Sequence, residues 1–321
     1  MNVREQELQS VVDPALTDAR LTELARRALG VAAGEVRGCS VLTGGCWNRV
    51  VAVRLGRREL VCKISPVRRD EKILREYRVL KHFRKRTALE VPEPLLLDTG
   101  ELMPGSTLVM TRIPGVVMHE CFGYLDAASR RKIRDSIAAD LADLHDHRAA
   151  GFGGVELKAA ERCPDWPAFW IPRFDRVLDE AEESGRVPEG LIDGARRIRP
   201  DLERFLGCGS EGTLTHYDIW SGNVMVDAST RPARVTGYID LPGFYADPVR
   251  ELSFAMLFGV ADRRFLDLYA ERHPLGADFE LRAAVYNLKM TIRHAQMYPG
   301  EPGYRRAAED CLSAIRRLAD A

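Results

Sequence analysis

The sequence lacks the features of a membrane or secreted protein. No apolar run approaches the roughly 20 residues that a membrane-spanning helix needs. Residues 1–16 contain no apolar segment of the kind that a secretory signal carries. The seven cysteines are odd in number and include no C-x-x-C pair, which argues against a disulfide framework or a zinc site. We therefore predict a cytoplasmic protein with free thiols and no membrane contact.

The sequence also lacks an excess of charge of one sign. Its 47 lysines and arginines balance its 47 aspartates and glutamates, so the net charge does not favour binding to nucleic acid. Lysine itself is scarce, with seven lysines against 40 arginines, so a lysine inside an apolar segment is unusual in this chain. Hydrophobic residues make up 45% of the 321 residues, which is enough for a sizeable core in one bilobal unit or two domains.

Strand-like and helical patterns are separated along the chain. After a predicted helix at 14–30, residues 36–113 hold several β-rich runs around one charged helix at 68–87. From Pro114 onward helical periodicity dominates, and one β-rich island at 213–240 interrupts it. The predicted helices of this second part cover 127–147, 166–184, 190–206, 262–272, 279–298 and 304–319. The pattern predicts an α+β protein with a small antiparallel sheet followed by a larger, mainly helical part.

The strongest chemical signal lies in the segment LTHYDIWSGNVMV, where Asn223 follows Asp218 by five residues. This D-x-x-x-x-N spacing is typical of kinase catalytic loops, in which a carboxylate orients the acceptor hydroxyl and an amide oxygen binds the metal on ATP. The apolar run 224–226 predicts a strand that would hold both groups. An isolated D-x-x-x-x-N is most often a surface loop. A second carboxylate, Asp240 at the end of the predicted hairpin, favours a site, because Mg²⁺ prefers oxygen ligands.

Two features of the first part of the chain suit an anionic ligand such as ATP. Lys63 lies in the apolar run VCKI, and it needs an anionic partner unless it faces outward from the strand. Glu76 on the following helix is the predicted partner, and Glu71 is a competing one. Gly44 and Gly45 lie between two strand-like runs, where they would either let backbone N–H groups approach phosphates or simply form a hairpin turn.

Together these segments resemble the aminoglycoside phosphotransferase family of kinase-like enzymes, and within it most closely the fructosamine kinases. The resemblance covers about residues 38–315. The family loop His-Gly-Asp-Leu-Trp-Ser-Gly-Asn corresponds to residues 216–223, and its Ile-Asp-Pro-Ala-x-Tyr-Tyr-Gly-Asp-x-x-x-Glu-Leu stretch corresponds to 239–252. Residues 141–145 match its Leu-x-x-Leu-His helix end.

The resemblance implies a bilobal protein-kinase-like fold. Residues 1–113 would form the nucleotide-binding lobe, and residues 114–321 would carry the catalytic loop and the acceptor site. Asp218 would be the catalytic base, and Asn223 and Asp240 would hold Mg²⁺. The candidate cofactor-binding residues are Gly44, Gly45, Lys63, Glu76, Thr111 and Ile113, the last two through their backbone. His216 and Asp247 would support the catalytic loops.

Aromatic residues and one histidine are candidate contacts for the acceptor. They are Tyr217, Trp220, Tyr245, His294 and Trp170. Tyr217 stands where the family usually has glycine, so it would either narrow the acceptor pocket or pack behind the loop. Trp166 and Trp170 are spaced by four residues, which fits a helix face in the core equally well. The acidic run 179–183 would either attract a cationic substrate or form a solvated helix face.

We predict an ATP- and Mg²⁺-dependent enzyme that phosphorylates a hydroxyl of a small molecule, as a monomer or homodimer. The acceptor would be an antibiotic of aminoglycoside or nucleoside type, inactivated in resistance, or a sugar or ketoamine. One alternative is a fructosamine kinase in protein deglycation, and another is a nucleotide-binding pseudokinase scaffold. A protein kinase is a further alternative, against which the missing Ala-Pro-Glu segment argues.

Overall fold

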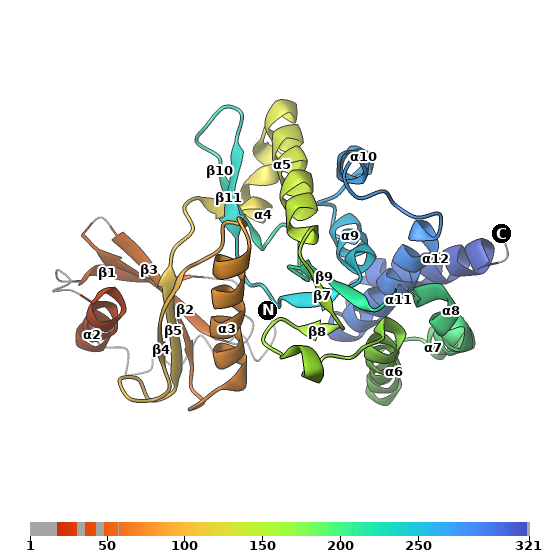
Figure 1. Ribbon diagram of the computed structural model, residues 1–321, viewed down its shortest axis with the longest axis horizontal. Helices are drawn as coiled ribbons and strands as arrows, with labels where there is room; N and C mark the ends of the chain where they lie inside the picture. Colours follow the sequence, from red (N-terminus) through yellow and green to blue (C-terminus); the bar gives the residue numbers. More distant parts are fainter. Residues whose placement is uncertain (1–17, 31–35, 43–47, 57, 208, 320–321) are drawn as a thin grey trace. The chain divides into compact units, whose positions relative to one another are not determined.

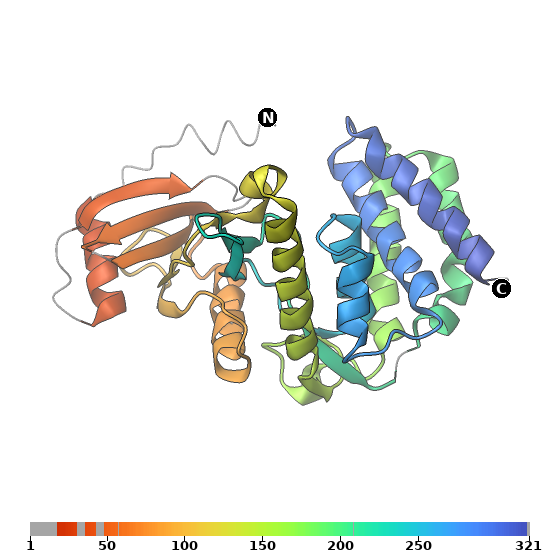
Figure 2. The ribbon, with the colours of Figure 1, turned by 90° about the horizontal axis from the view of Figure 1, so that it is seen from above.

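The computed structural model describes residues 18–30, 36–42, 48–56, 58–207 and 209–319. They form two compact units, which are drawn in Figures 1 and 2. The first unit contains the described residues up to Pro114 together with Thr236–Asp240. The second contains Gly115–Val235 and the described residues from Leu241 onward. The short segment Thr236–Asp240 is thus separated in sequence from the rest of its unit.

The first unit is built on a five-stranded antiparallel sheet. Its strands are β1 (Val36–Leu42), β2 (Arg49–Leu55), β3 (Arg58–Ser65), β4 (Pro94–Asp98) and β5 (Ser106–Thr111). Their order is β1-β2-β3-β5-β4, so β3 lies in the middle of the sheet. Every neighbouring pair is antiparallel, as predicted.

Two helices, α2 (Asp18–Leu29) and α3 (Glu71–Arg86), flank this sheet on opposite sides (Figure 1). Side chains alternate between the two faces of a strand. Cys62 and Ile64 of β3 therefore pack with α2 in one apolar cluster. Lys63, between them, points to the opposite face, where α3 lies.

The second unit is mainly helical. Its α-helices are α4 (Met118–Cys121), α5 (Ala127–His145), α6 (Trp166–Ser184), α7 (Glu189–Ile198), α8 (Leu202–Leu206), α9 (Pro248–Leu257), α10 (Arg263–Ala270), α11 (Phe279–Met297) and α12 (Pro302–Ala319). Helix α11 packs against α12, α9 and α6, and the blue pair α11 and α12 is seen side by side in Figure 2. None of the described helices combines the length and apolarity that a membrane-spanning helix needs.

Two small sheets complete the structure. One has the order β11-β10-β6, with β6 (Val116–Val117), β10 (Val224–Asp227) and β11 (Arg234–Tyr238). The other has the order β7-β9-β12-β8, with β7 (Arg148–Ala150), β8 (Gly153–Gly154), β9 (Glu211–Thr215) and β12 (Phe244–Ala246). The hairpin β10–β11 agrees with the predicted β-rich island. The predictions missed helices α4 and α9 and the strands of two or three residues.

Candidate active site

Lys63 is the centre of an ion-pair cluster in the first unit. Its Nζ atom lies 2.7 Å from Oε1 of Glu76 on α3, and it also donates a hydrogen bond to Oδ1 of Asp240. The side chains of Lys63 and Glu76 are only 13% and 17% exposed, whereas that of Asp240 is 47% exposed. The predicted partner Glu76 is thus present, and the competing Glu71 is not the partner. Strand β3 and helix α3 together fix the position of the amine.

The charges in this cluster are unequal. Burial opposes the charge on Lys63, but Glu76 and Asp240 outweigh it and raise the pKa of the lysine above its usual value. Burial also raises the pKa of Glu76, and the negative charge of Asp240 adds to this effect, although Lys63 counteracts both. One ammonium group therefore serves two carboxylates. Asp240 is the more exposed of the two carboxylates and is therefore the one that a further cation can reach.

Asp240 follows β11 in an unusual backbone conformation. Its φ of 55° is in the left-handed region, which residues other than glycine rarely adopt and which is often found at functional sites. Its segment is anchored within the first unit, because the Tyr238 N–H donates to the Glu90 carbonyl oxygen at 2.8 Å. The Thr236 hydroxyl donates to the Pro114 carbonyl oxygen. These bonds place Asp240 beside Lys63 despite 177 residues of separation in sequence.

Asp218 and Asn223 lie together in the second unit, in the loop that leads into β10. Nδ2 of Asn223 donates to Oδ2 of Asp218 at 2.8 Å and to the Asp218 carbonyl oxygen at 2.9 Å. Asn223 is 4% exposed. Because both bonds use the nitrogen of the amide, its oxygen points away from Asp218. This amide oxygen is a hard ligand of the kind that Mg²⁺ prefers.

Two consecutive residues of helix α9 hold the backbone of this loop through hydrogen bonds. The Tyr217 N–H donates to the fully buried carboxylate of Glu251, and the Arg250 guanidinium donates to the Tyr217 carbonyl oxygen. Glu251 in turn contacts Nε2 of His145 at 2.8 Å, and Nδ1 of His145 lies 2.7 Å from the Tyr269 hydroxyl. Burial opposes the charge on Glu251, but the bonds from His145 and Tyr217 keep its pKa below the usual value. The carboxylate thus remains a strong acceptor.

His216 and Asp247 act as structural supports, as predicted. His216 is fully buried, and its Nδ1 accepts a hydrogen bond from the Asp218 N–H at 3.2 Å. Asp247 is also fully buried and caps helix α9, accepting the Val249 N–H at 3.0 Å. It further binds the guanidinium of Arg282 and the hydroxyl of Tyr286. Both residues stabilise backbone next to the loop.

Comparison with known proteins identifies the family of this chain. The model of the phosphotransferase enzyme family matches residues 38–283, which is more than half of the sequence. The chain belongs to the phosphotransferase enzyme family. As a member it is an enzyme that transfers a phosphoryl group to a hydroxyl of a small molecule, and such transfer uses a nucleotide donor.

Relatives and solved structures agree with this assignment. A provisionally named ketoamine kinase of Enterococcus faecium is 26% identical over 270 residues, covering 80% of this chain and 88% of its own. The ketosamine-3-kinase of Mus musculus is 25% identical, covering 92% of this chain and 98% of its own. The crystal structure of a protein of Thermobifida fusca, provisionally named fructosamine-3-kinase, aligns with a TM-score of 0.68 at 20% identity, covering 94% of this chain and 99% of that one. The predicted α+β, kinase-like fold is confirmed.

Two of the acceptor candidates of this phosphotransferase lie in the loop itself, Tyr217 half-buried and Trp220 exposed. Tyr217 has a φ of 79°, and its ring lies against Phe244 with a centroid separation of 4.3 Å. The guanidinium carbon of Arg250 lies 3.7 Å from the centroid of the same ring. Trp220 is 36% exposed, with its ring 6.2 Å from that of His119. Tyr217 and Trp220 remain candidates for contact with the acceptor.

Two other candidates, Trp170 and Tyr245, pack as core residues, and we keep neither as a substrate contact. Trp170 is 1% exposed, stacks on Phe174 and meets the edge of Tyr286. Tyr245 is 4% exposed, and its ring faces the guanidinium of Arg162 at 4.2 Å. The i, i+4 spacing of the tryptophans on α6 therefore reflects a buried helix face, which was the alternative interpretation.

His294 is half-buried on α11. Its Nδ1 lies 2.8 Å from the Met290 carbonyl oxygen, and its ring packs 5.0 Å from that of Tyr304 on α12. Burial lowers the pKa of His294. A neutral ring that donates its Nδ1 proton to its own helix fits a packing role between helices, so the predicted substrate contact finds no support in these bonds.

The backbone contacts of Thr111 and Ile113 to the nucleotide base remain a prediction. Gly44 and Gly45, the candidates for approaching the phosphates, lie outside the described residues. The Thr111 N–H donates to the Glu93 carbonyl oxygen at 3.0 Å. The N–H of Thr111 is therefore already engaged within the first unit.

The acidic run on α6 is engaged by arginines. Asp179 and Glu182 both pair with Arg196 of α7, and Glu180 pairs with Arg293 of α11. These pairs oppose the interpretation of the run as an attractor for a cationic substrate.

Arg250 was not predicted as a functional residue, although it binds the catalytic loop. The signal that could have found it is the start of α9, where an aspartate caps a helix whose first residue is proline.

Proposed function

We propose that this phosphotransferase is an ATP- and Mg²⁺-dependent kinase that phosphorylates a hydroxyl of a ketoamine or a related sugar derivative in the cytoplasm. The observation that carries the proposal is the buried amine of Lys63, which is shared between Glu76 and the more exposed Asp240. A lysine braced by a helix glutamate is the device with which kinases bind ATP phosphates.

In the proposed reaction Asp218 orients the acceptor hydroxyl and accepts its proton. The hydrogen bond from Nδ2 of Asn223 fixes the rotamer of the Asp218 carboxylate. The backbone N–H of Asp218 is bound by His216, and the preceding residue, Tyr217, is bound by helix α9. Such positioning contributes most of the catalysis in phosphoryl transfer, since the protein forms no covalent bond to the phosphoryl group.

Lys63, Asp240 and Asn223 would bind the nucleotide and its metal. When bound, ATP supplies the phosphoryl group and Mg²⁺ neutralises the charge on its phosphates. Each ligand is by itself of the kind that a hard cation prefers, because Asp240 of the first unit has a half-exposed carboxylate and Asn223 of the second unit has an amide oxygen. Lys63 would bind phosphate oxygens while Glu76 keeps it in place.

The substrate class rests on the relatives. The Enterococcus faecium protein is named for ketoamines and the mouse protein for ketosamines, and both align with at least 80% of this chain. Ketoamines carry several sugar hydroxyls, so they are suitable acceptors for an aspartate base. We therefore favour a ketoamine over an antibiotic as the acceptor.

The test is ADP release by the purified protein with Mg-ATP and a panel of ketoamines, aminoglycosides, nucleoside antibiotics and simple sugars. We expect release that depends on a ketoamine and that disappears in Asp218→Ala, while that variant still binds ATP. ATP binding without release for any acceptor would instead support the pseudokinase scaffold. ADP release that depends on an aminoglycoside alone would show that the acceptor is an aminoglycoside and not a ketoamine, while the proposed phosphoryl transfer would still hold.

A further inference from the structure

Five cationic side chains gather on three helices of the second unit, α6, α9 and α11. They are Arg173, Arg176, Arg250, Lys289 and Arg293, and we call them the cationic cluster. None of them belongs to the residues that were predicted to bind the nucleotide or the metal.

The positions of these residues on the helices bring the charges together. Lys289 and Arg293 are four residues apart on α11, so they share one face, as do Arg173 and Arg176 on α6. Helix α11 packs against α6, and Nζ of Lys289 lies 5.5 Å from the centroid of a tryptophan ring on α6. The two cationic faces therefore meet along the edge of the α6–α11 contact.

The cluster adjoins the catalytic loop. Arg250 covers the ring of Tyr217, the residue before Asp218, and also reaches Sδ of Met290 at 3.8 Å, beside Lys289.

A second link to the loop runs through aromatic rings. Arg173 lies 3.6 Å from the centroid of Phe169, the ring of Phe169 lies 6.1 Å from that of Phe244, and Phe244 contacts Tyr217. A group bound at the cluster would thus be close to the residue that flanks the proposed base.

Carboxylates do not balance this charge. Among the described residues, only Arg293 of the cluster forms an ion pair with a carboxylate, that of Glu180 at 3.2 Å. Another acid of α6, Asp175, pairs with Arg199, the residue that follows α7. Glu251 is engaged by His145 and the loop backbone. Burial, and then repulsion from the four arginines, lowers the pKa of Lys289 to about 7.

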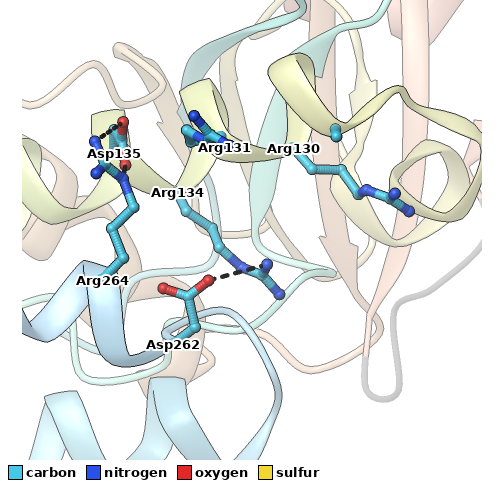
Figure 3. A pocket seen from close by; sticks show the side chains of 7 residues that line it. Arg130, Arg131, Arg134, Asp135, Asp262 and Arg264 are labelled. Carbon is cyan, nitrogen blue, oxygen red and sulfur yellow. Dashed lines mark hydrogen bonds and ion pairs between the residues drawn. The ribbon is translucent and has the colours of Figure 1, made fainter.

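A second arginine-rich site in the same unit shows the contrast. A hollow of about 220 Å³ lies beside α5 and α10. Figure 3 shows the side chains that line it. There Arg134 pairs with Asp262 at 3.2 Å, and Arg264 binds Asp135 through two bonds of 2.9 Å. Arg134 and Arg264, two of the four arginines that line that hollow, are thus paired with carboxylates. The cationic cluster has no comparable set of partners.

We infer that the acceptor substrate carries an anionic group, a carboxylate or a phosphate monoester, that binds at the cationic cluster beside Lys289. This inference rests on the proposed kinase function and narrows its substrate class. Uncompensated cations at a partly buried site are relieved by a bound anion, and charge-assisted bonds from arginine and lysine are strong. A polycationic antibiotic would be repelled. Ketoamines formed on amino acids with a free carboxylate fit the site.

The kinetic test compares pairs of acceptors in which one member carries the anionic group and the other lacks it. The pairs are the fructosyl derivatives of glycine and of lysine, each with a free carboxylate or as the amide, and fructose 6-phosphate against fructose. We expect kcat/KM to be about tenfold higher for the charged member of a pair, which corresponds to about 1.4 kcal/mol. The ratio should fall to near one in Lys289→Met and stay unchanged in Arg131→Gln, which alters the other arginine-rich site. Preference for a carboxylate or for the phosphate identifies the source of the anion.

A binding measurement separates the failure of this inference from the failure of the kinase assignment. Calorimetry with inorganic phosphate and with acetate, in two buffers of different ionisation enthalpy at about pH 8, needs no turnover. We expect anion binding with proton uptake in the wild type and in Arg131→Gln, and its loss in Lys289→Met and in Arg173→Gln.

Equal turnover of charged and neutral acceptors would overturn the anionic substrate while the kinase stands. Anion binding that is unchanged in Lys289→Met and Arg173→Gln would overturn the site itself. If no acceptor is phosphorylated, the kinase proposal fails and the calorimetry alone decides whether the cluster binds anions.

Discussion

At the scale of single residues, Glu76 and Glu71 form a matched pair for a test of the Lys63 cluster. Both lie on α3, but only Glu76 contacts the lysine, at 2.7 Å. Glu76→Gln should raise the KM for ATP about tenfold or more, because the amine loses its fixed position, while Glu71→Gln should leave it unchanged. Steady-state kinetics at varied Mg-ATP measure this. Equal effects of the two variants would contradict the assigned brace.

The backbone conformation of Tyr217 is energetically unfavourable, and the contacts of its ring offset this cost. Its φ of 79° is unfavourable for any side chain with a Cβ atom, by roughly 1 kcal/mol. We expect Tyr217→Gly to be more stable than Tyr217→Ala by about 1 kcal/mol, although alanine is normally the more stabilising residue. Urea unfolding of the two variants measures this difference in stability. Both variants lose the same ring contacts, so the comparison isolates the backbone effect. An alanine variant as stable as the glycine variant would show that the loop relaxes.

Lys289 should make stability depend on pH in a defined direction. Its folded-state pKa of about 7 lies below the usual lysine value, so the unfolded chain binds more protons between about pH 7 and pH 10. The cost of charging Lys289 is fully present below pH 7 and disappears as pH rises through that window. In buffers without phosphate, Lys289→Met should therefore be more stable than the wild type by about 2 kcal/mol at about pH 6, and by progressively less as the pH rises from about 7 to about 10. A difference that is constant with pH would contradict the lowered pKa.

Residue identities of the site could be predicted where a motif fixes their spacing. The D-x-x-x-x-N spacing gave Asp218 and Asn223, and the apolar context of Lys63 led to Glu76. Tertiary packing brings Asp240 next to Lys63, and it also brings Lys289 among the arginines of α6 and α9. In both cases the residues are far apart in the sequence. Spacing in the sequence does not encode such contacts.

At the scale of elements, helix α9 couples stability to the catalytic loop. Its cap Asp247 is fully buried against Arg282, so Asp247→Asn would leave a guanidinium without its partner. We expect a loss of about 3 kcal/mol and a loss of turnover, since α9 also holds the loop. Asp126→Asn, at the exposed cap of α5, should have a far smaller effect on both. Thermal unfolding and ADP release measure the two properties, and equal losses in the two variants would refute the coupling.

The elements also show where periodicity succeeds and where it fails. Helices such as α6 and α11 have one buried and one solvated face, so the spacing of their apolar residues predicted the bounds of each helix closely. In α9 seven consecutive residues are buried, from Val249 to Ala255, so no stripe reveals the helix. Strands of two or three residues, such as β8, are too short for an alternation. Their conformation comes from their neighbours in the sheet.

At the scale of the whole molecule, the ligand should stabilise the folded protein. A nucleotide that binds only the native state adds about 2.7 kcal/mol of stability at about 100 times its Kd. Mg-ATP should therefore raise the melting temperature of the wild type and of Asp218→Ala, but raise it far less in Lys63→Met. A thermal shift measured without acceptor tests this. An equal shift in Lys63→Met would mean that the nucleotide binds without the lysine.

The segment Thr236–Asp240 has a consequence for recombination between related genes. It belongs to the first unit although the chain reaches it only after most of the second. A chimaera joined once, after Pro114, would combine Lys63 and Glu76 from one parent with Asp240 from the other. A functional exchange of the first unit would need two donor pieces, the long N-terminal one and a separate stretch of five residues. Successful hybrids should therefore inherit the two pieces together.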